Sequence, residues 1–137
     1  MRIVVLADTH APRRWRACPP RVAAELRGAD LILHAGDVCT ASVLAELTQY
    51  APVVAVLGNN DDPDVALWGA AQTAELSLPA DLVVFGHSHI PLDQSGYGLR
   101  IFNPGSPTDR RRQPHGTLGV LRIADGQLAE ATIVPVS

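Results

Sequence analysis

Four strand-length apolar runs in this chain each end in residues that bind metals. The runs at residues 2–7, 31–35, 53–57 and 82–85 are followed by Asp8-Thr9-His10, Gly36-Asp37, Gly58-Asn59-Asn60-Asp61 and Gly86-His87-Ser88-His89. Carboxylate, amide oxygen and imidazole are ligands that suit Mn, Fe, Zn or Ni better than a thiolate-loving ion. Their repeated delivery at the ends of apolar runs favours a metal site.

The spacing of these residues leaves room for two ions. Asp8 and His10 are two residues apart and would share one face of a strand, so both can reach one ion just past the strand end. His87 and His89 repeat that spacing, and Asp37 stands alone, where it can bridge. Paired metals about 3.5–4 Å apart generate a nucleophilic hydroxide and clamp a phosphoryl group for in-line displacement. The pattern therefore points to phosphate chemistry.

The apolar runs are typical of a parallel sheet that is covered on both faces. Ligands of such sheets gather at the carboxyl ends of the strands, which would bring the four motifs to one rim. Between the runs, helices are expected from Pro19-Pro20 through Leu26 with a stop at Gly28, from Ala41 to Gln49 after Thr40, and from Asp62-Pro63-Asp64 onward. This alternation over the first ninety residues predicts βαβ units and an α/β fold.

The tail of the chain has a different pattern. Residues 116–123 and 127–136 flank Asp125-Gly126, which is a strong β-hairpin signal. We expect these two strands to be antiparallel and to form or extend a second sheet.

The motifs D-x-H, G-D, G-N-x-D and G-H-x-H, in this order and each after a strand, resemble those of the calcineurin-like metallophosphoesterases. The sequence Phe-Asn-Pro-Gly-Ser-Pro at 102–107 makes the chain most similar to the small bacterial and archaeal phosphodiesterases of that superfamily. The resemblance runs from Met1 to about Gly116; one motif alone is weak, but four in order are specific. It implies one domain over residues 1–137 with a two-sheet αββα sandwich and a metal centre at the carboxyl ends of the central strands.

The resemblance also implies a ligand set for two divalent ions, with Mn as the first choice and Fe, Zn or Ni as alternatives. Asp8, His10, Asp37 and His89 match the ligands of the first metal. Asp37, Asn59 and His87 match ligands of the second, with Asp37 bridging. The family normally adds a His between the last two motifs, but residues 62–81 contain none. Either the chain is naturally shorter here and the second ion has three protein ligands and water, or the sequence as given omits a flexible segment of the protein.

The implied reaction is phosphodiester hydrolysis, in which a bridging hydroxide held at Asp37 attacks phosphorus in line and Asn59 orients the phosphate. Larger relatives have a His where Asn60 stands. Asn cannot shuttle a proton at neutral pH, so diesters with good leaving groups should be favoured. The resemblance leaves two alternatives: a phosphomonoesterase, or a non-catalytic scaffold like the retromer coat subunit of the same superfamily. The retained donor set favours an enzyme.

Two arginine clusters each have two interpretations. The segment Arg110-Arg111-Arg112 either lies along the rim, where Arg110 would bind a phosphate, or forms a solvated loop. The arginines 13, 14 and 16 either form a substrate-facing flap with Trp15 or a surface loop with Trp15 packed inward.

Each donor also has an ordinary structural interpretation when it is taken alone. Asp8 and Asp37 can stabilise turns, and the histidines of the motifs can be solvated residues at strand ends. Their joint occurrence favours metal binding. His34 lies within an apolar run and should be a hydrogen-bonded core residue. His115 is expected near the site or merely exposed, and Cys39 is expected to shape the pocket without binding metal.

The overall composition is compatible with a cytoplasmic enzyme that acts on a small phosphoester. The chain has 137 residues, is 47% hydrophobic and has a net charge of −3, which argues against a general nucleic-acid-binding surface. Cys18 and Cys39 form no C-x-x-C pattern, which fits a reduced cytosol. No signal peptide and no apolar stretch of about 20 residues is expected, so a membrane partner is not predicted.

Overall fold

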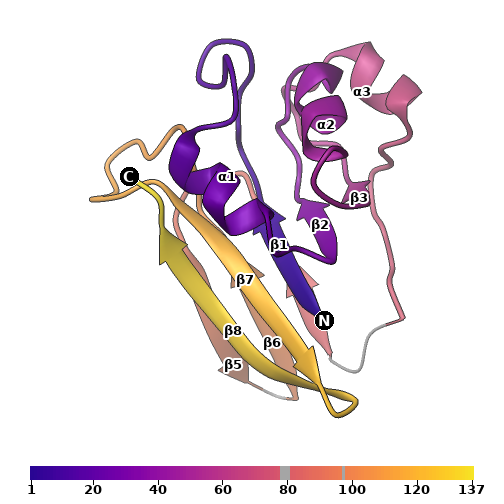
Figure 1. The fold of residues 1–137 in the computed structure, drawn as a ribbon, viewed down its shortest axis with the longest axis vertical. Coiled ribbons are helices and arrows are strands. Elements are labelled where there is room, and N and C mark those ends of the chain that lie inside the picture. Colours follow the sequence, from indigo (N-terminus) through magenta and orange to yellow (C-terminus); the bar gives the residue numbers. More distant parts are fainter. Residues whose placement is uncertain (78–80, 97) are drawn as a thin grey trace.

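The computed structural model describes residues 1–77, 81–96 and 98–137 and contains two facing sheets (Figure 1). The strands are β1 (Arg2–Leu6), β2 (Leu31–His34), β3 (Val53–Ala55), β4 (Leu82–Val84), β5 (Leu92–Gly96), β6 (Leu99–Asn103), β7 (Thr117–Ala124) and β8 (Gln127–Pro135). The helices are α1 (Pro20–Leu26), α2 (Ala41–Leu47) and α3 (Pro63–Trp68). The helices α1 and α2 lie over the outer face of the larger sheet, and α3 packs beside α2.

The larger sheet has the strand order β3-β2-β1-β7-β8. The strands β1, β2 and β3 are parallel, as the strand–helix alternation predicts. The hairpin β7–β8 turns at Asp125 and Gly126, both with positive φ, which confirms that prediction. Its expected place in a second sheet is wrong, because β7 pairs antiparallel with β1 and so extends the first sheet. The open edge of β1 is available for this pairing since β2 and β3 both lie on its other side.

The smaller sheet has the order β4-β6-β5. The fourth apolar run was expected to continue the parallel sheet, but β4 pairs with β6 in this second sheet. The hairpin β5–β6 that makes this pairing possible is not predicted by the sequence, because β5 is short, polar and almost fully exposed. Its residues therefore lack the apolar alternation that marks a half-buried strand.

Alternation along β1 builds the core on both sides of the larger sheet. Ile3 and Val5 point to the smaller sheet, where they pack with Phe102. Val4 and Leu6 point to the helices. Full burial of each such side chain stabilises the fold by about 1.5–3 kcal/mol. This strand, which is buried on both faces, ends at Leu6, two residues before Asp8.

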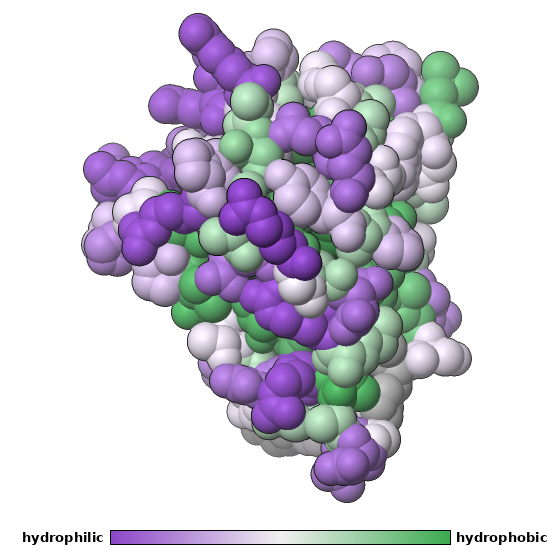
Figure 2. Space-filling view, in the orientation of Figure 1, coloured by the Kyte–Doolittle hydropathy of each residue, from purple (hydrophilic) through white to green (hydrophobic). Residues whose placement is uncertain are grey.

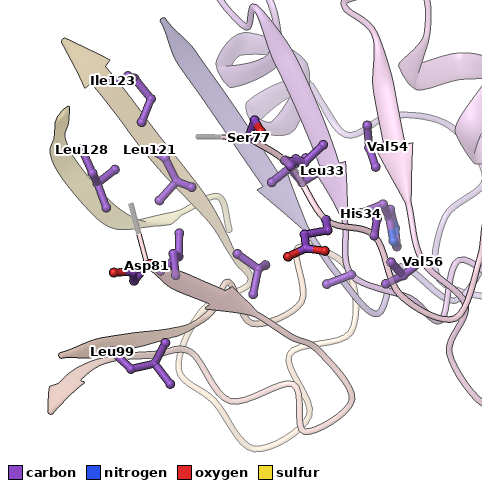
Figure 3. A pocket seen from close by; sticks show the side chains of 16 residues that line it. Leu33, His34, Val54, Val56, Ser77, Asp81, Leu99, Leu121, Ile123 and Leu128 are labelled. Atoms are coloured by element: carbon purple, nitrogen blue, oxygen red, sulfur yellow. The ribbon is translucent and has the colours of Figure 1, made fainter. Parts of the chain in front are cut away.

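The layer between the sheets also contains a cavity of about 540 Å³ (Figure 3). Side chains from both sheets line it, among them Leu33 and Leu121 of the larger sheet and Leu99 of the smaller one, together with residues 74–77 and 81–82. It is mostly apolar and has none of the six expected metal ligands among its lining residues.

The helices begin where their sequence signals place them. Proline occupies the first helical position of α1 and α3, and Thr40 precedes α2. The helix α2 ends at Leu47, two residues before its expected end, and residues 48–50 form turns. In the described part of the chain, no helix has the length and apolar character needed to cross a membrane.

Candidate metal centre

Three predicted ligands from two distant segments converge at the end of β1. Asp8, His10 and His89 each offer one ligand atom, and these atoms lie within 4.8 Å of one another. The Nε2 atoms of His10 and His89 are 3.1 Å apart, and the two rings stack with centroids 5.0 Å apart. Two imidazole nitrogens and a carboxylate oxygen that face one point are a donor set for a borderline divalent cation.

The carboxylate of Asp8 fits a cation better than it fits an unliganded protein. It is fully buried, and Oδ1 accepts a hydrogen bond from the His87 backbone at 3.0 Å. Oδ2 is buried and has no hydrogen-bond partner among the described residues. Burial is the main cause that raises the pKa of this carboxyl above its ordinary value. A buried oxygen without a donor is costly, and a cation on the side of His10 and His89 would satisfy it.

Neighbouring groups fix the orientation of both histidine rings. His89 is buried, and its Nδ1–H donates to the Asp109 carbonyl at 2.6 Å, which leaves the Nε2 lone pair free as a ligand. Nδ1 of His10 lies 3.5 Å from the thiol of Cys39. Cys39 thus contacts the nitrogen of the His10 ring opposite the one that faces His89, and its role in shaping the pocket stays a prediction.

Asp37 connects this cluster with the residues after β3. It is buried, its Oδ2 lies 3.8 Å from Nε2 of His10, and it accepts bonds from the backbone and side-chain amides of Asn60, both at 3.0 Å. The side-chain amide of Asn59 faces the same carboxylate. With its nitrogen turned inward, Asn59 would donate to both Asp37 oxygens at 3.1 Å. With its oxygen turned inward, the Asn59 amide oxygen lies beside the two carboxylate oxygens of Asp37, an arrangement that suits a cation.

A cavity of about 690 Å³ adjoins the second half of the site. Asp8, Asp37, Asn59 and His87 line it, and His87 is exposed to it. The remaining lining residues include the apolar Val56, Leu57, Val84 and Phe85. His87 therefore faces the side where Asp37 and Asn59 lie, and a small organic ester has room beside these donors.

The backbone at the site is held in an uncommon conformation. Positive φ angles between 49° and 79° occur at Asp8, His10, Asp37, Cys39, His87 and His89. Asp and His enter this left-handed region more readily than most residues, but each instance still costs about 1–3 kcal/mol. Concentration of such residues at one place is typical of a functional site, where the surrounding structure maintains the strain.

Close approach of two loops at this site requires a glycine. A Cβ on Gly58 would overlap the Asp37 carboxylate and crowd the Asp37 backbone. Asp61 joins the same loops, since Oδ1 accepts from the Cys39 amide at 2.6 Å and Oδ2 from the Gly58 amide at 2.7 Å. Asp61 is part of the G-N-x-D motif, but sequence reasoning assigned it no role.

The Asn-Pro-Gly-Ser turn supports the site from the other side. Ser106 Oγ donates to the Asp8 carbonyl at 2.8 Å, and Thr108 Oγ1 donates to the Thr9 carbonyl at 2.9 Å. Asn103 donates to the Gly86 carbonyl and to Ser88 Oγ. The turn was noted in the sequence as part of the resemblance, and its contacts with Asp8 and Gly86 explain why it accompanies the metal motifs.

The other residues singled out in the sequence lie as follows. His34 is a buried core residue: its Nδ1 accepts from the Gly36 amide and its Nε2–H donates to Thr9 Oγ1, which confirms the prediction. Burial lowers the pKa of His34 to about 3. His115 is exposed, with its ring bonded to the Ser137 carbonyl. Trp15 is packed inward, and Arg110 is exposed and donates to the Gln113 carbonyl.

Comparison with known proteins identifies the family. The model of the calcineurin-like phosphoesterase superfamily domain matches residues 1–78 and 68–126. A probable metallophosphoesterase of Methanothermobacter thermautotrophicus is 34% identical over 160 positions, which cover 98% of this chain and 92% of the relative. A probable metallophosphoesterase of Methanocaldococcus jannaschii is 26% identical, with 99% of this chain and 82% of the relative covered.

Solved structures share the fold at low identity. Vps29 of Entamoeba histolytica, in a crystal structure with Zn²⁺, has a TM-score of 0.75 and 19% identity over 100% of both chains. A protein described as a novel archaeal phosphodiesterase has a TM-score of 0.74 and 18% identity, covering 98% of this chain and 99% of its own.

The alignments also bear on the histidine that is missing between the last two motifs. The two pieces of the family match overlap at residues 68–78. The alignment with the Methanothermobacter relative has 160 positions, more than the 137 residues of this chain. The relative therefore carries residues that have no counterpart here.

The chain belongs to the calcineurin-like phosphoesterase superfamily, a family of metal-dependent phosphoesterases.

Proposed function

We propose that this protein is a phosphodiesterase that uses two divalent cations. One observation carries the proposal: ligand atoms of Asp8, His10 and His89 lie within 4.8 Å of one another, and one oxygen of the buried Asp8 carboxylate, Oδ2, has no hydrogen-bond partner among the described residues. The adjoining cavity of about 690 Å³ supplies room for an ester beside Asp37 and His87.

Asp8, His10, Asp37 and His89 would hold the first cation, and Asp37, Asn59 and His87 the second. The mixture of carboxylate, amide and imidazole donors suits Mn²⁺ first, with Fe, Zn and Ni as alternatives. Two cations bound here would supply a nucleophilic hydroxide near neutral pH and stabilise the charge on the phosphoryl group during in-line attack.

Asn60 and the cavity wall supply the selectivity in this proposal. The side-chain amide of Asn60 lies 3.0 Å from Asp37 and can turn its N–H groups to a phosphoryl oxygen. It cannot protonate a departing alkoxide, so the leaving group must be stable without a proton. Phe85 and Leu57 offer an apolar surface to one ester substituent. These properties favour diesters over alkyl monoesters.

A non-catalytic scaffold is the competing function, because Vps29 proteins share the fold. One of them was crystallised with Zn²⁺, so metal binding alone does not separate the two functions. A scaffold gains nothing from an unpartnered buried carboxylate oxygen or from left-handed backbone at six positions in the three loops of the site. These costs favour catalysis.

The test is hydrolysis of bis(p-nitrophenyl) phosphate with Mn²⁺ by wild-type protein and by Asp37→Asn. The variant removes the negative charge shared by both cation positions, so turnover should fall about 100-fold or more. Metal content by elemental analysis should fall with it. Asp93→Asn, which changes an exposed partner of Arg100 on β5, is the control and should behave as wild type. Undiminished turnover and metal content in Asp37→Asn would contradict the proposal.

A further inference from the structure

The positive charge of this chain is concentrated beside the metal centre. All 11 basic residues are arginines, and six of them lie in two short segments, 13–16 and 110–112. We call these six the arginine rim: Arg13, Arg14, Arg16, Arg110, Arg111 and Arg112. All six are exposed. The remaining five arginines are outnumbered by the 14 acidic residues of the chain, so the net charge of −3 conceals a strong local asymmetry.

Hydrogen bonds and an ion pair connect both segments of the rim with the loops that carry and orient His10 and His89. The Arg14 amide donates to the His10 carbonyl at 2.8 Å, and its Nε lies 3.9 Å from the Asp109 carboxylate. Asp109 is also the residue whose carbonyl accepts from His89, and Arg110 follows it directly. Thr108 and Thr9 lie in the loops that lead into the two segments, and the side chain of Thr108 joins these loops by donating to the Thr9 carbonyl. The rim is therefore built on the loops that carry and orient His10 and His89.

The view of the surface agrees with this placement. Hydrophilic side chains gather along the upper left of Figure 2, the region that the loop before α1 and the loop before β7 occupy in Figure 1. The cavity on the other half of the site has no arginine among its lining residues, which include Phe85 and Leu57. The centre thus has a cationic border at His10 and His89 and a partly apolar cavity at Asp37 and His87.

We propose that the substrate is a short single-stranded oligonucleotide with a terminal phosphate. The terminal phosphate binds the arginine rim, and the diester that is hydrolysed lies at the cations. This inference rests on the proposed phosphodiesterase function. Guanidinium groups bind phosphate through several N–H donors, and a ring of like charges raises the local concentration of an anion by about 10- to 1,000-fold. A long polyanion would meet the acidic remainder of the surface, which limits the substrate to a short one.

The experiment compares thymidylyl-thymidine with the same dinucleotide carrying a 5′-phosphate, in the presence of Mn²⁺. Wild-type protein should hydrolyse the phosphorylated form with at least about tenfold higher kcat/KM. The rim variant is Arg13→Gln, Arg16→Gln and Arg112→Gln, which spares Arg14 and Arg110 because they make contacts within the loops. It should lose this preference through a higher KM at unchanged kcat.

A matched control removes three exposed arginines outside the rim: Arg21→Gln, Arg27→Gln and Arg122→Gln. It changes the net charge equally and should keep the preference for the phosphorylated dinucleotide. The rim variant should hydrolyse bis(p-nitrophenyl) phosphate, a monoanion without a second phosphate, with a smaller rise in KM than it shows for the phosphorylated dinucleotide. Circular dichroism verifies that each variant folds. Equal kcat/KM for the two dinucleotides in wild type, or an equal loss in both triple variants, would overturn the proposal.

Two further measurements separate the possible failures. If wild-type protein hydrolyses no diester, the proposed function fails, but fluorescence anisotropy with the labelled phosphorylated dinucleotide still tests the rim. Rim-dependent binding there would retain the ligand class, and its absence would refute it. Rim-dependent binding to phosphatidylglycerol vesicles without any dinucleotide preference would assign the rim to a lipid surface and overturn the oligonucleotide proposal.

Discussion

Acidification from pH 7 to pH 5 should destabilise this fold through His34, whose ring is buried beneath the loop that carries Asp8 and His10. Burial lowers the pKa of His34 from 6.5 to about 3 in the folded protein. Below pH 6.5 the unfolded chain takes up a proton that the folded chain does not, so the stability present above 6.5 is lost as the pH falls toward 3. At roughly 1.36 kcal/mol per pH unit, the loss between pH 7 and pH 5 is about 2 kcal/mol.

Urea unfolding with a chelator present measures this loss without a contribution from metal-linked protons. We expect His34→Gln to be less stable than wild type at pH 7, because the side chain that links Gly36 and Thr9 changes. Its stability should nevertheless fall by about 2 kcal/mol less than that of wild type between pH 7 and pH 5. Burial raises the pKa of Asp8, which acts in the opposite direction, but this contribution is common to both proteins and cancels in the difference.

His115→Gln is the control, because this ring is exposed and bonded to the last residue of the chain. Its pH dependence should match that of wild type. An identical pH dependence of wild type and His34→Gln would refute the assignment of acid sensitivity to the buried ring. A reduced pH dependence in His115→Gln as well would show that the effect is not specific to the buried ring of His34.

Three other predictions concern the site directly. Gly58→Ala should weaken Mn²⁺ binding by about tenfold or more in titration calorimetry, because the new Cβ displaces the Asp37 carboxylate. The control Gly28→Ala, whose new Cβ would make ordinary contacts at 3.7 Å or more, should bind Mn²⁺ as wild type does. Titration of metal-free protein with Mn²⁺ should show two separated phases, since the proposed second position would have three protein donors and the proposed first position four; a single tight phase of two ions would contradict this. Initial rates should favour bis(p-nitrophenyl) phosphate over alkyl phosphomonoesters because Asn60 cannot protonate a leaving group, and the reverse order would rule out that role.

The donors and their order were readable from the sequence because they are local features. A strand that is buried on both faces must be a continuous apolar run, and its carboxyl end must be followed by the residues that line the crevice. Asp8, Asp37 and His89 each follow the end of an apolar strand within a few residues, so their positions along the chain were enough to predict them as donors. Helix starts were equally local, since a proline or a capping residue acts within one turn.

The partners of those donors were decided by the tertiary structure. Asp109 orients His89 from 20 residues away, and Ser106 holds the Asp8 carbonyl from 98 residues away. Neither contact has a periodic signal in the sequence. Whether Trp15 faced the substrate or the core also depended on packing, and it is buried in the core.

The assignment of strands to sheets also separates what the sequence determined from what the tertiary structure decided. The sequence by itself determined that residues 82–85 and 116–136 contain strands, because alternation and the Asp125-Gly126 turn are local. It did not determine that β4 joins β6 or that β7 joins β1, because any strand edge presents the same row of backbone donors and acceptors. The choice among edges is made by side-chain burial from both sheets at once, as between Ile3, Phe102 and Leu121, and that burial exists only in the folded chain.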